Sequence, residues 1–183
     1  PFFRGIRTIM TVHNLKFQGV WDIQTMRRFT GLPGHVFTLG RMEFHRDANM
    51  LKGGLVYADR ITTVSNTYAN EIRMPYYGEG LDGLLNARSD SLWGIVNGID
   101  YDLYNPATDK MIAENYDETT FEEGKKACKL AIQRELGMPE DPDVMMIAMI
   151  TRLTDQKGFD LVEWVMERLL TSRVQLVIIG TGD

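Results

Sequence analysis

The sequence predicts an α/β protein in which parallel strands are connected by helices. Three observations lead to this prediction. A continuous apolar run, Val144–Ile150, is typical of a parallel strand that helices bury on both faces. A short polar loop follows it, and apolar residues then recur at helical spacing at Phe159, Val162, Met166 and Leu169. Because helices are expected to bury both of its faces, this strand is predicted to be central.

The loop Thr151–Gly158 after this strand contains the first candidate site residues. Arg152 stands at the end of the strand, and Lys157 falls in the first turn of a helix that Thr154 or Asp155 can cap. Ligands of open α/β sheets bind beyond the carboxyl ends of the strands, where two cations can pair with a diphosphate. A short loop with solvated basic residues has the same spacing, and from spacing alone that interpretation is favoured.

The N-terminal part begins with a predicted strand, Ile6–Val12, that leads into His13, Asn14, Gln18 and Gly19. Such a loop brings hydrogen-bonding side chains to the carboxyl edge of a sheet, where a sugar can be held. A lone histidine in this position is more often structural than functional. The following stretch, 22–39, is interrupted by glycine and proline and predicts short helices.

The next elements alternate between helix and strand. Glu43–Tyr57 has Met50, Leu51, Leu55 and Val56 at helical spacing and predicts a helix, although its glycine pair weakens the pattern. Ala58–Ser65 reads as a strand, and Asn66 as the cap of a helix over Thr67–Arg73. A helix over Leu81–Arg88 and a strand over Trp93–Val96 follow.

The second half continues with a polar stretch, Ala107–Thr120, that is typical of a linker or surface segment. Phe121–Leu136 predicts a helix with Gly137 at its C-terminal cap. After the central strand and its helix, Arg173–Ile179 predicts the next parallel strand, and Gly180–Gly182 follow it. A glycine pair there lets the backbone approach a ligand, but Gly-x-Gly alone is weak evidence.

Composition limits the class of protein. The 183 residues are 44% hydrophobic and 25% charged, as in an ordinary globular protein, and the net charge of −5 without a basic run argues against nucleic-acid binding. Cys128 is the only cysteine, so no intrachain disulfide is expected and a reducing, cytoplasmic location is predicted. Apolar runs stay well below the roughly 20 residues of a membrane span. The scattered histidines predict no metal site.

Several stretches together give the chain a resemblance to the glycogen/starch synthase family of retaining glycosyltransferases. They occur in one order over nearly the whole chain, which makes them specific as a set: Thr11–Leu15 with Phe17–Gly19, Leu51–Gly54 with Tyr57–Asp59, Thr62–Ser65, Gly80–Leu85, Gly94–Asp100, Arg152–Gly158 and Gly180–Asp183.

The resemblance implies the GT-B fold, in which two Rossmann-like domains with parallel sheets flank the active site. Residues 1–96 would then be the C-terminal part of the N-terminal, acceptor-side domain. Residues 97–183 would be the N-terminal part of the C-terminal domain, which binds the nucleotide sugar. The family's Lys-x-Gly-Gly loop would precede Pro1 and its glutamate motif would follow Asp183, so a fragment of a larger enzyme is expected.

The resemblance also assigns roles to single residues. Arg152 and Lys157 match the residues that bind the donor diphosphate and stabilise the departing nucleotide, which reverses the interpretation from spacing. His13 matches the histidine beside the transferred glucose, and Asn97 a polar residue near the sugar at the domain junction. Further candidates for substrate contact are Asn14, Gln18, Gly180 and Gly182.

The function implied is transfer of glucose from ADP-glucose to the non-reducing end of an α-1,4-glucan such as glycogen, with retention of configuration. No cofactor is implied, because the nucleotide sugar is a substrate. UDP-glucose is the alternative donor, and bacterial-type members favour ADP-glucose. The alternative for residues 1–183 alone is a catalytically silent Rossmann-like segment with at most weak nucleotide binding, because a cleft needs both walls to exclude water.

Overall fold

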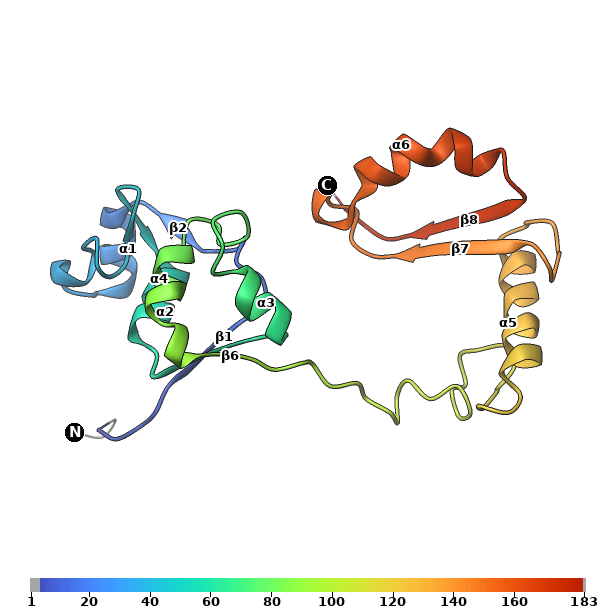
Figure 1. The fold of residues 1–183 in the computed structure, drawn as a ribbon, viewed down its shortest axis with the longest axis horizontal. Coiled ribbons are helices and arrows are strands. Elements are labelled where there is room, and N and C mark those ends of the chain that lie inside the picture. Colours follow the sequence, from blue (N-terminus) through green and yellow to red (C-terminus); the bar gives the residue numbers. More distant parts are fainter. Residues whose placement is uncertain (1–3, 183) are drawn as a thin grey trace. The chain divides into compact units, whose positions relative to one another are not determined.

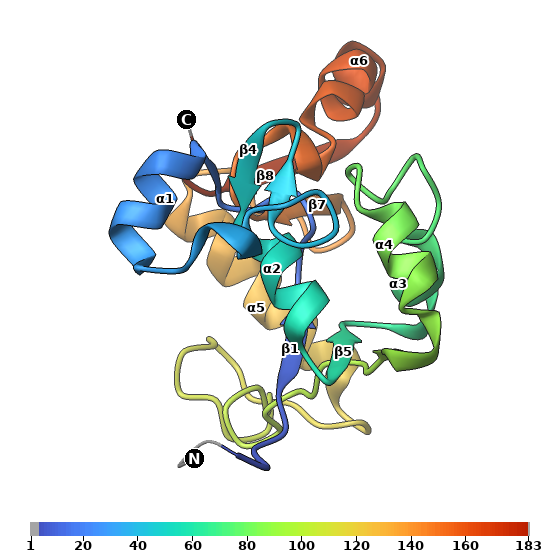
Figure 2. The ribbon, with the colours of Figure 1, turned by 90° about the vertical axis from the view of Figure 1, so that its left-hand side faces the viewer.

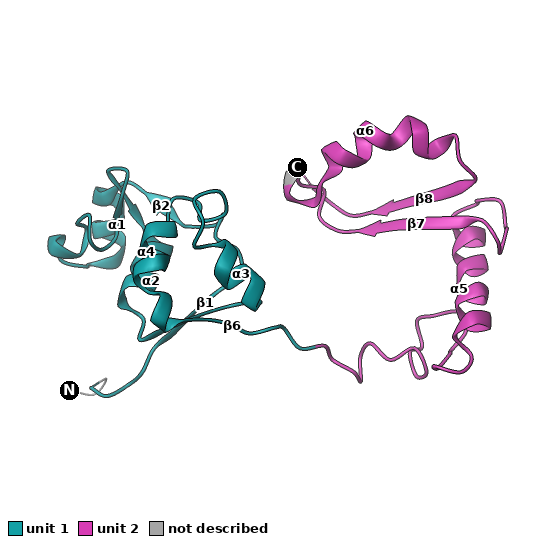
Figure 3. Cartoon of the chain, in the orientation of Figure 1, with its two compact units in different colours: residues 1–98 teal, residues 99–183 magenta. Residues whose placement is uncertain are grey.

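The chain forms two compact units, which have different colours in Figure 3. This computed structural model describes residues 4–182, without the side chain of Asp155. Unit 1 ends at Gly98 and unit 2 begins at Ile99. The sequence places the boundary after Val96 instead. That the two units are the acceptor-side and donor-side domains stays a prediction.

Unit 1 contains a parallel sheet of three strands in the order β1-β5-β6. The strands are β1 (Ile9–Val12), β5 (Arg60–Thr63) and β6 (Leu92–Gly94). The sequence predicts all three, and the structure confirms them with ends that differ by a few residues. Because the strands run in the same direction, their carboxyl ends lie along one border, which we call the carboxyl edge of unit 1.

A second, antiparallel sheet in unit 1 was not predicted. Its order is β2-β4-β3, with β2 over Val20–Trp21, β3 over Glu43–Phe44 and β4 over Asp47–Asn49. The helix predicted over 43–57 is therefore wrong in its first half. His45 and Arg46 form the turn between β3 and β4 with φ values of 53° and 75°, and two positive φ values are the signature of a type I′ hairpin turn.

The first helix of unit 1 has well-defined ends. In α1 (Ile23–Thr30), the carboxylate of Asp22 accepts the Thr25 N–H at 2.8 Å, and Gly31 ends the helix with a φ of 67°. The short helix η1 (Gly34–Val36) follows, so the prediction of short helices here is confirmed. α1 lies beside β4 (Figure 2). The helical half of the 43–57 prediction is α2 (Met50–Tyr57).

The remaining helices of unit 1 are α3 (Asn66–Glu71), α4 (Asp82–Ala87) and the short η2 (Ser89–Ser91). Ser65, not Asn66, caps α3, because the Ser65 hydroxyl accepts the Tyr68 N–H at 2.9 Å. Apolar side chains from the parallel sheet, from the loop after β1, from α2, α3 and α4, and from capping residues of α3 and α4 form the core of unit 1: Val12, Leu15, Leu51, Leu55, Ile61, Ala69, Ile72, Leu81, Leu85 and Leu92.

Unit 2 contains two parallel strands, β7 (Met145–Ile150) and β8 (Val174–Ile179), paired in register along their whole length. The helix α5 (Phe121–Glu135) precedes β7, and α6 (Phe159–Leu170) connects the strands and packs beside β8 (Figure 1). The predicted strands and helices are confirmed here, including Gly137 after α5 with a φ of 65°.

β7 is not the buried central strand that its apolar run predicts. Within residues 99–182 it pairs only with β8, and its two end residues, Met145 and Ile150, are 63% and 79% exposed. Burial of both faces and both edges needs more secondary structure than this stretch contains. The apolar run therefore identified a parallel strand correctly, but not its surroundings.

A buried glutamine ties α5 to the sheet of unit 2. Gln133 is fully buried, its Nε2 donates to Gln175 Oε1 at 2.7 Å, and its Oε1 accepts the Asp141 N–H at 2.9 Å. These bonds satisfy a polar group that would otherwise be costly to bury. Between residues 4 and 182, no helix is both long and apolar enough to cross a membrane.

Candidate functional site

The carboxyl ends of β7 and β8 carry two loops that are hydrogen-bonded to each other. The Thr151 N–H donates to the Ile179 carbonyl at 3.0 Å, and the Leu153 N–H donates to the Thr181 carbonyl at 2.9 Å. Leu153 and Gly182 form an isolated parallel bridge. The ladder between the strands thus continues into both loops, and we call this region, 151–158 with 180–182, the carboxyl edge of unit 2.

Gly180 and Gly182 make this contact between the two loops possible. A Cβ atom at Gly180 would overlap the carbonyl oxygen of Thr151, and one at Gly182 would overlap the carbonyl oxygen of Leu153. In the structure the two glycines allow a close approach to protein backbone, whereas the predicted approach to a ligand stays a prediction. Their assignment to substrate binding stays a prediction, and Asp183 lies outside the described residues.

Arg152 is the second residue of the loop between β7 and α6. Lys157 is not in the element that the sequence predicts for it. The sequence put Lys157 in the first turn of a helix capped by Thr154 or Asp155, and that is wrong. Lys157 ends the short helix η3 (Asp155–Lys157), and the N-cap of α6 is Gly158 in the left-handed conformation, with a φ of 69°. The left-handed residue turns the chain between the two helices, which only glycine does without strain.

Both cations are available for a ligand. Arg152 and Lys157 are exposed, and neither makes a side-chain hydrogen bond or ion pair within the described part of the chain. The N-terminus of α6 adjoins Lys157 at the same edge of the sheet. A guanidinium, an ammonium and the N–H groups of a helix N-terminus together suit a phosphate-bearing ligand.

The carboxyl edge of unit 1 carries the other sequence-predicted residues. His13 and Asn14 come directly after β1, and Asn97 follows β6. β1 and β6 are both neighbours of β5, so the loops after them leave the sheet at one border. His13 and Asn97 are exposed, whereas Asn14 is half-buried and its Oδ1 accepts the Lys16 N–H at 2.9 Å.

Gln18 differs from the other candidates because protein atoms occupy both ends of its amide. Only 8% of the residue is exposed. Its Nε2 donates to the Glu79 carbonyl at 3.0 Å, and its Oε1 accepts from Asn49 Nδ2 at 2.5 Å. The structure therefore gives Gln18 a structural environment, and a direct contact with sugar stays a prediction.

Two residues of this region were missed in the sequence. Asn49 is fully buried and is the N-cap of α2, and the Tyr68 hydroxyl accepts the Leu15 N–H at 3.3 Å. An asparagine directly before a helical pattern is a recognisable N-cap signal. A helix predicted from Glu43 onward places Asn49 inside the helix and hides this signal. No sequence pattern indicated Tyr68.

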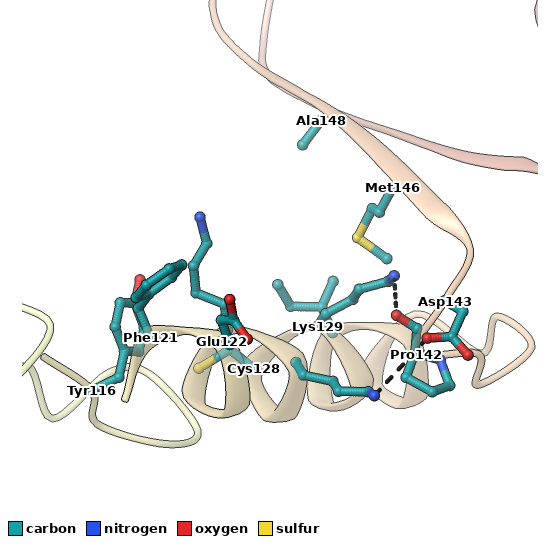
Figure 4. A pocket seen from close by; sticks show the side chains of 12 residues that line it. Tyr116, Phe121, Glu122, Cys128, Lys129, Pro142, Asp143, Met146 and Ala148 are labelled. Atoms are coloured by element: carbon teal, nitrogen blue, oxygen red, sulfur yellow. Dashed lines mark hydrogen bonds and ion pairs between the residues drawn. The ribbon is translucent and has the colours of Figure 1, made fainter. Parts of the chain in front are cut away.

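A pocket of about 640 Å³ lies between α5 and β7 of unit 2 (Figure 4). Side chains such as Phe121, Met146 and Ala148 line it, and none of the predicted site residues does. Lys129 also lines the pocket, and its Nζ donates to the carbonyls of Pro142 and Val144. Among residues 4–182, no group of three or more His, Cys, Asp or Glu side chains is placed to hold a metal ion.

Comparisons with known proteins show what the chain is similar to. Residues 1–87 match the family model described as the starch synthase catalytic domain. The chain is 58% identical to the glycogen synthase of Lachnospira eligens over 182 residues, and 53% identical to that of Lachnoclostridium phytofermentans over 181 residues. These alignments cover 100% and 99% of the chain and 38% of either relative.

A solved structure extends the similarity to the fold. The catalytic domain of starch synthase IV from Arabidopsis thaliana, bound to ADP and acarbose, matches with a TM-score of 0.88 and 32% identity. The match covers 96% of this chain and 36% of that one. The expected fold, parts of two Rossmann-like domains of the GT-B type, is confirmed. The chain is similar over its whole length to part of the glycogen and starch synthases, and it spans 38% of the length of the curated relatives that it matches.

Proposed function

We propose that the protein transfers glucose from ADP-glucose to the non-reducing end of an α-1,4-glucan, with retention of configuration. The observation that carries the proposal is the pair of exposed cations, Arg152 and Lys157, at the carboxyl edge of unit 2. Its relatives are named glycogen synthase, and ADP is named with the Arabidopsis structure, which favours ADP-glucose over UDP-glucose. We propose the cytoplasm as the compartment, because the chain has one cysteine.

In the reaction, the bond between glucose C1 and the β-phosphate oxygen breaks, and ADP leaves with that electron pair. Negative charge therefore grows on the β-phosphate in the transition state. Arg152 would bind two phosphate oxygens through its planar fork, and Lys157 would act as a compact charge. Fixed cations stabilise a developing charge best where water is excluded.

Bond formation completes the exchange. The 4-hydroxyl oxygen of the glucan's terminal residue attaches to C1, and its proton goes to the β-phosphate oxygen of the departing ADP. Attack on the face from which ADP departs would retain the configuration, which is our hypothesis for the mechanism. We assign His13 and Asn97 to the glucose, with the carbonyl or imidazole of His13 supporting the positive charge at the sugar centre. Asn14 is a weaker candidate.

The remaining candidates have supporting roles in this proposal. Gly180 and Gly182 would lie under the nucleotide, because the turn that they form stands beside the loop of Arg152. Gln18 would act on the sugar only through the loop that it holds. The glycogen acceptor and the nucleotide sugar are then the two substrates, and the reaction as written uses no further cofactor.

A glucose-transfer assay tests the proposal. The protein expressed from its complete open reading frame is incubated with glycogen and radiolabelled ADP-glucose, with UDP-glucose in a parallel reaction. We expect label in the glycogen, faster with ADP-glucose. Absence of label with both donors would refute the function, and faster transfer from UDP-glucose would correct the donor. Residues 1–183 alone are expected to be silent, and turnover by them would refute the requirement for further chain.

A further inference from the structure

The loop that carries His13 is held by a buried asparagine on another element. We call residues 13–19 the β1–β2 loop. Asn49 lies at the end of β4, is fully buried, and directs its amide nitrogen to Gln18 Oε1 at 2.5 Å. This bond joins two segments 31 residues apart in the sequence. It is a contact between two buried amides, which is costly to lose because either group alone would be left unpaired.

The same asparagine completes the N-terminus of α2. The first turn of a helix has N–H groups without partners inside the helix. Here the Met50 N–H donates to the Gly19 carbonyl at 3.1 Å and the Leu51 N–H donates to the Gln18 carbonyl at 3.0 Å. The Lys52 N–H donates to Asn49 Oδ1 at 2.8 Å. The β1–β2 loop and Asn49 thus cap α2 together.

These contacts allow only one orientation of the two amides. Because Asn49 Oδ1 accepts from Lys52, the Nδ2 of Asn49 must face Gln18, and Gln18 must present its oxygen. The Nε2 of Gln18 then points to the carbonyl of Glu79, where it donates at 3.0 Å. The chain of bonds fixes the loop against both α2 and the segment before α4.

We propose that Asn49 and Gln18 are positioning residues, which hold the β1–β2 loop so that His13 keeps its place at the carboxyl edge of unit 1. The inference rests on the proposed function, in which His13 acts on the transferred glucose. Leu15 anchors the middle of the loop, since it is 1% exposed and its N–H donates to Tyr68. Displacement of a reacting group by about 1 Å is enough to reduce a rate about 100-fold.

The competing explanation is that Asn49 merely caps α2. Two variants separate the explanations. Asn49→Ser keeps a side-chain oxygen for the Lys52 N–H but loses the amide that reaches Gln18, whereas Asn49→Ala loses both. Asp22→Ala is the matched control, because it removes the N-cap of α1 and leaves the β1–β2 loop untouched.

All variants are made in the protein expressed from its complete reading frame, and kcat, KM and melting temperature are measured for each. We expect kcat of Asn49→Ser and Asn49→Ala to fall about 10- to 100-fold, with a smaller change in KM for the donor. Asn49→Ser should lose less melting temperature than Asn49→Ala, and Asp22→Ala should keep its kcat. Gln18→Ala combined with Asn49→Ser should be no worse than either change alone.

Hydrogen exchange gives a readout that does not depend on catalysis. Amides of the β1–β2 loop should exchange faster in Asn49→Ser than in the wild type or in Asp22→Ala. A kcat of Asn49→Ser within about twofold of the wild type, or unchanged exchange in the loop, would overturn the proposal. A wild type without transferase activity would refute the proposed function instead, and the exchange experiment would still decide whether Asn49 fixes the loop.

Discussion

In both units an Arg–Asp ion pair lies where the parallel strands begin, at the border that we call the amino edge of the sheet. In unit 1, Arg7 before β1 pairs with Asp59 before β5 at 2.9 Å. In unit 2, Arg173 before β8 pairs with Asp141, which precedes β7, at 2.5 Å. Each pair joins the beginnings of two neighbouring strands, so these four charges have partners and a structural role.

The carboxyl edges differ from the amino edges and from each other. At the edge of unit 1, the loop after β1 is fixed by neutral, buried amides, Gln18 and Asn49, that satisfy one another. At the edge of unit 2, Arg152 and Lys157 are exposed and make no ion pair with any described residue. A cation that has no protein partner keeps its full attraction for an anionic ligand. Neutral hydrogen bonds thus fix the loop at the carboxyl edge of unit 1, whereas the carboxyl edge of unit 2 presents two exposed positive charges.

Replacement of Lys157 by alanine should have the largest effect, and it tests the charge assigned to unit 2. We expect turnover to fall about 100- to 1,000-fold, as when a single group that stabilises transition-state charge is removed. The melting temperature should stay almost unchanged, because the side chain is exposed and makes no ion pair with any described residue. Steady-state kinetics and thermal denaturation of the full-length protein measure the two effects.

Lys125→Ala is the matched control for this experiment. Lys125 is also an exposed lysine of unit 2, on α5, but it lines the α5–β7 pocket and not the carboxyl edge. Its replacement should leave turnover unchanged. If Lys157→Ala turns over like the wild type, Lys157 has no part in the reaction and the contrast between the two units loses its chemical meaning.

Replacement of Gly182 by alanine should have the next largest effect, on stability. A Cβ at Gly182 would overlap the backbone of Leu153, so the loops after β7 and β8 must separate. We expect unit 2 to lose about 1–3 kcal/mol, as in other overpacked sites. Denaturant unfolding without nucleotide measures this loss, because a glycine needed only for ligand approach would leave the ligand-free protein unaffected.

Gly83→Ala is the control in unit 1. Gly83 lies within α4, and nothing surrounds the position of its Cβ within 4 Å. Alanine there should stabilise unit 1 slightly, because it restricts the unfolded chain without strain in the helix. Equal losses from the two substitutions would show that the close contact between the loops of unit 2 is not what requires glycine.

Much of the fold could be predicted because strong local patterns coincided with the tertiary structure. The apolar runs of β7 and β8 and the helical pattern of α5, with Gly137 after it, are long enough to be read without ambiguity. The β3–β4 hairpin could not be predicted in this way. Its turn consists of His45 and Arg46, whereas type I′ turns are usually recognised in a sequence by an Asn-Gly pair.

The candidate site was predictable to a different degree in each unit. Arg152 and Lys157 are identified by a contiguous motif, so a resemblance suffices to find them. Asn49 is separated from Gln18 by 31 residues, and only the folded structure brings the two amides together. Lys157 was placed in the wrong element because Gly158, and not a side-chain cap, begins α6. Local patterns thus identify candidate charged residues more readily than buried contacts between distant segments.

The smallest expected effect concerns the amino edge of unit 1, through the pH dependence of stability. The Thr8 backbone N–H, and after it the Arg7 guanidinium, hold the pKa of the Asp59 carboxyl below its ordinary value of 3.8. A carboxyl whose pKa is lower in the folded state stabilises that state above the unfolded pKa. This contribution disappears as pH falls through the folded pKa. The melting temperature of Asp59→Asn should therefore lie below that of the wild type at neutral pH, and the difference should shrink below about pH 4.

Asp90→Asn removes the same charge from an exposed carboxylate that bonds to no described residue, and should lower the melting temperature little at any pH. A difference between wild type and Asp59→Asn that stays constant from pH 7 to pH 3 would mean that the carboxylate's charge does not hold β1 to β5. The amino edge would then resemble the carboxyl edge of unit 1, where neutral hydrogen bonds do this work.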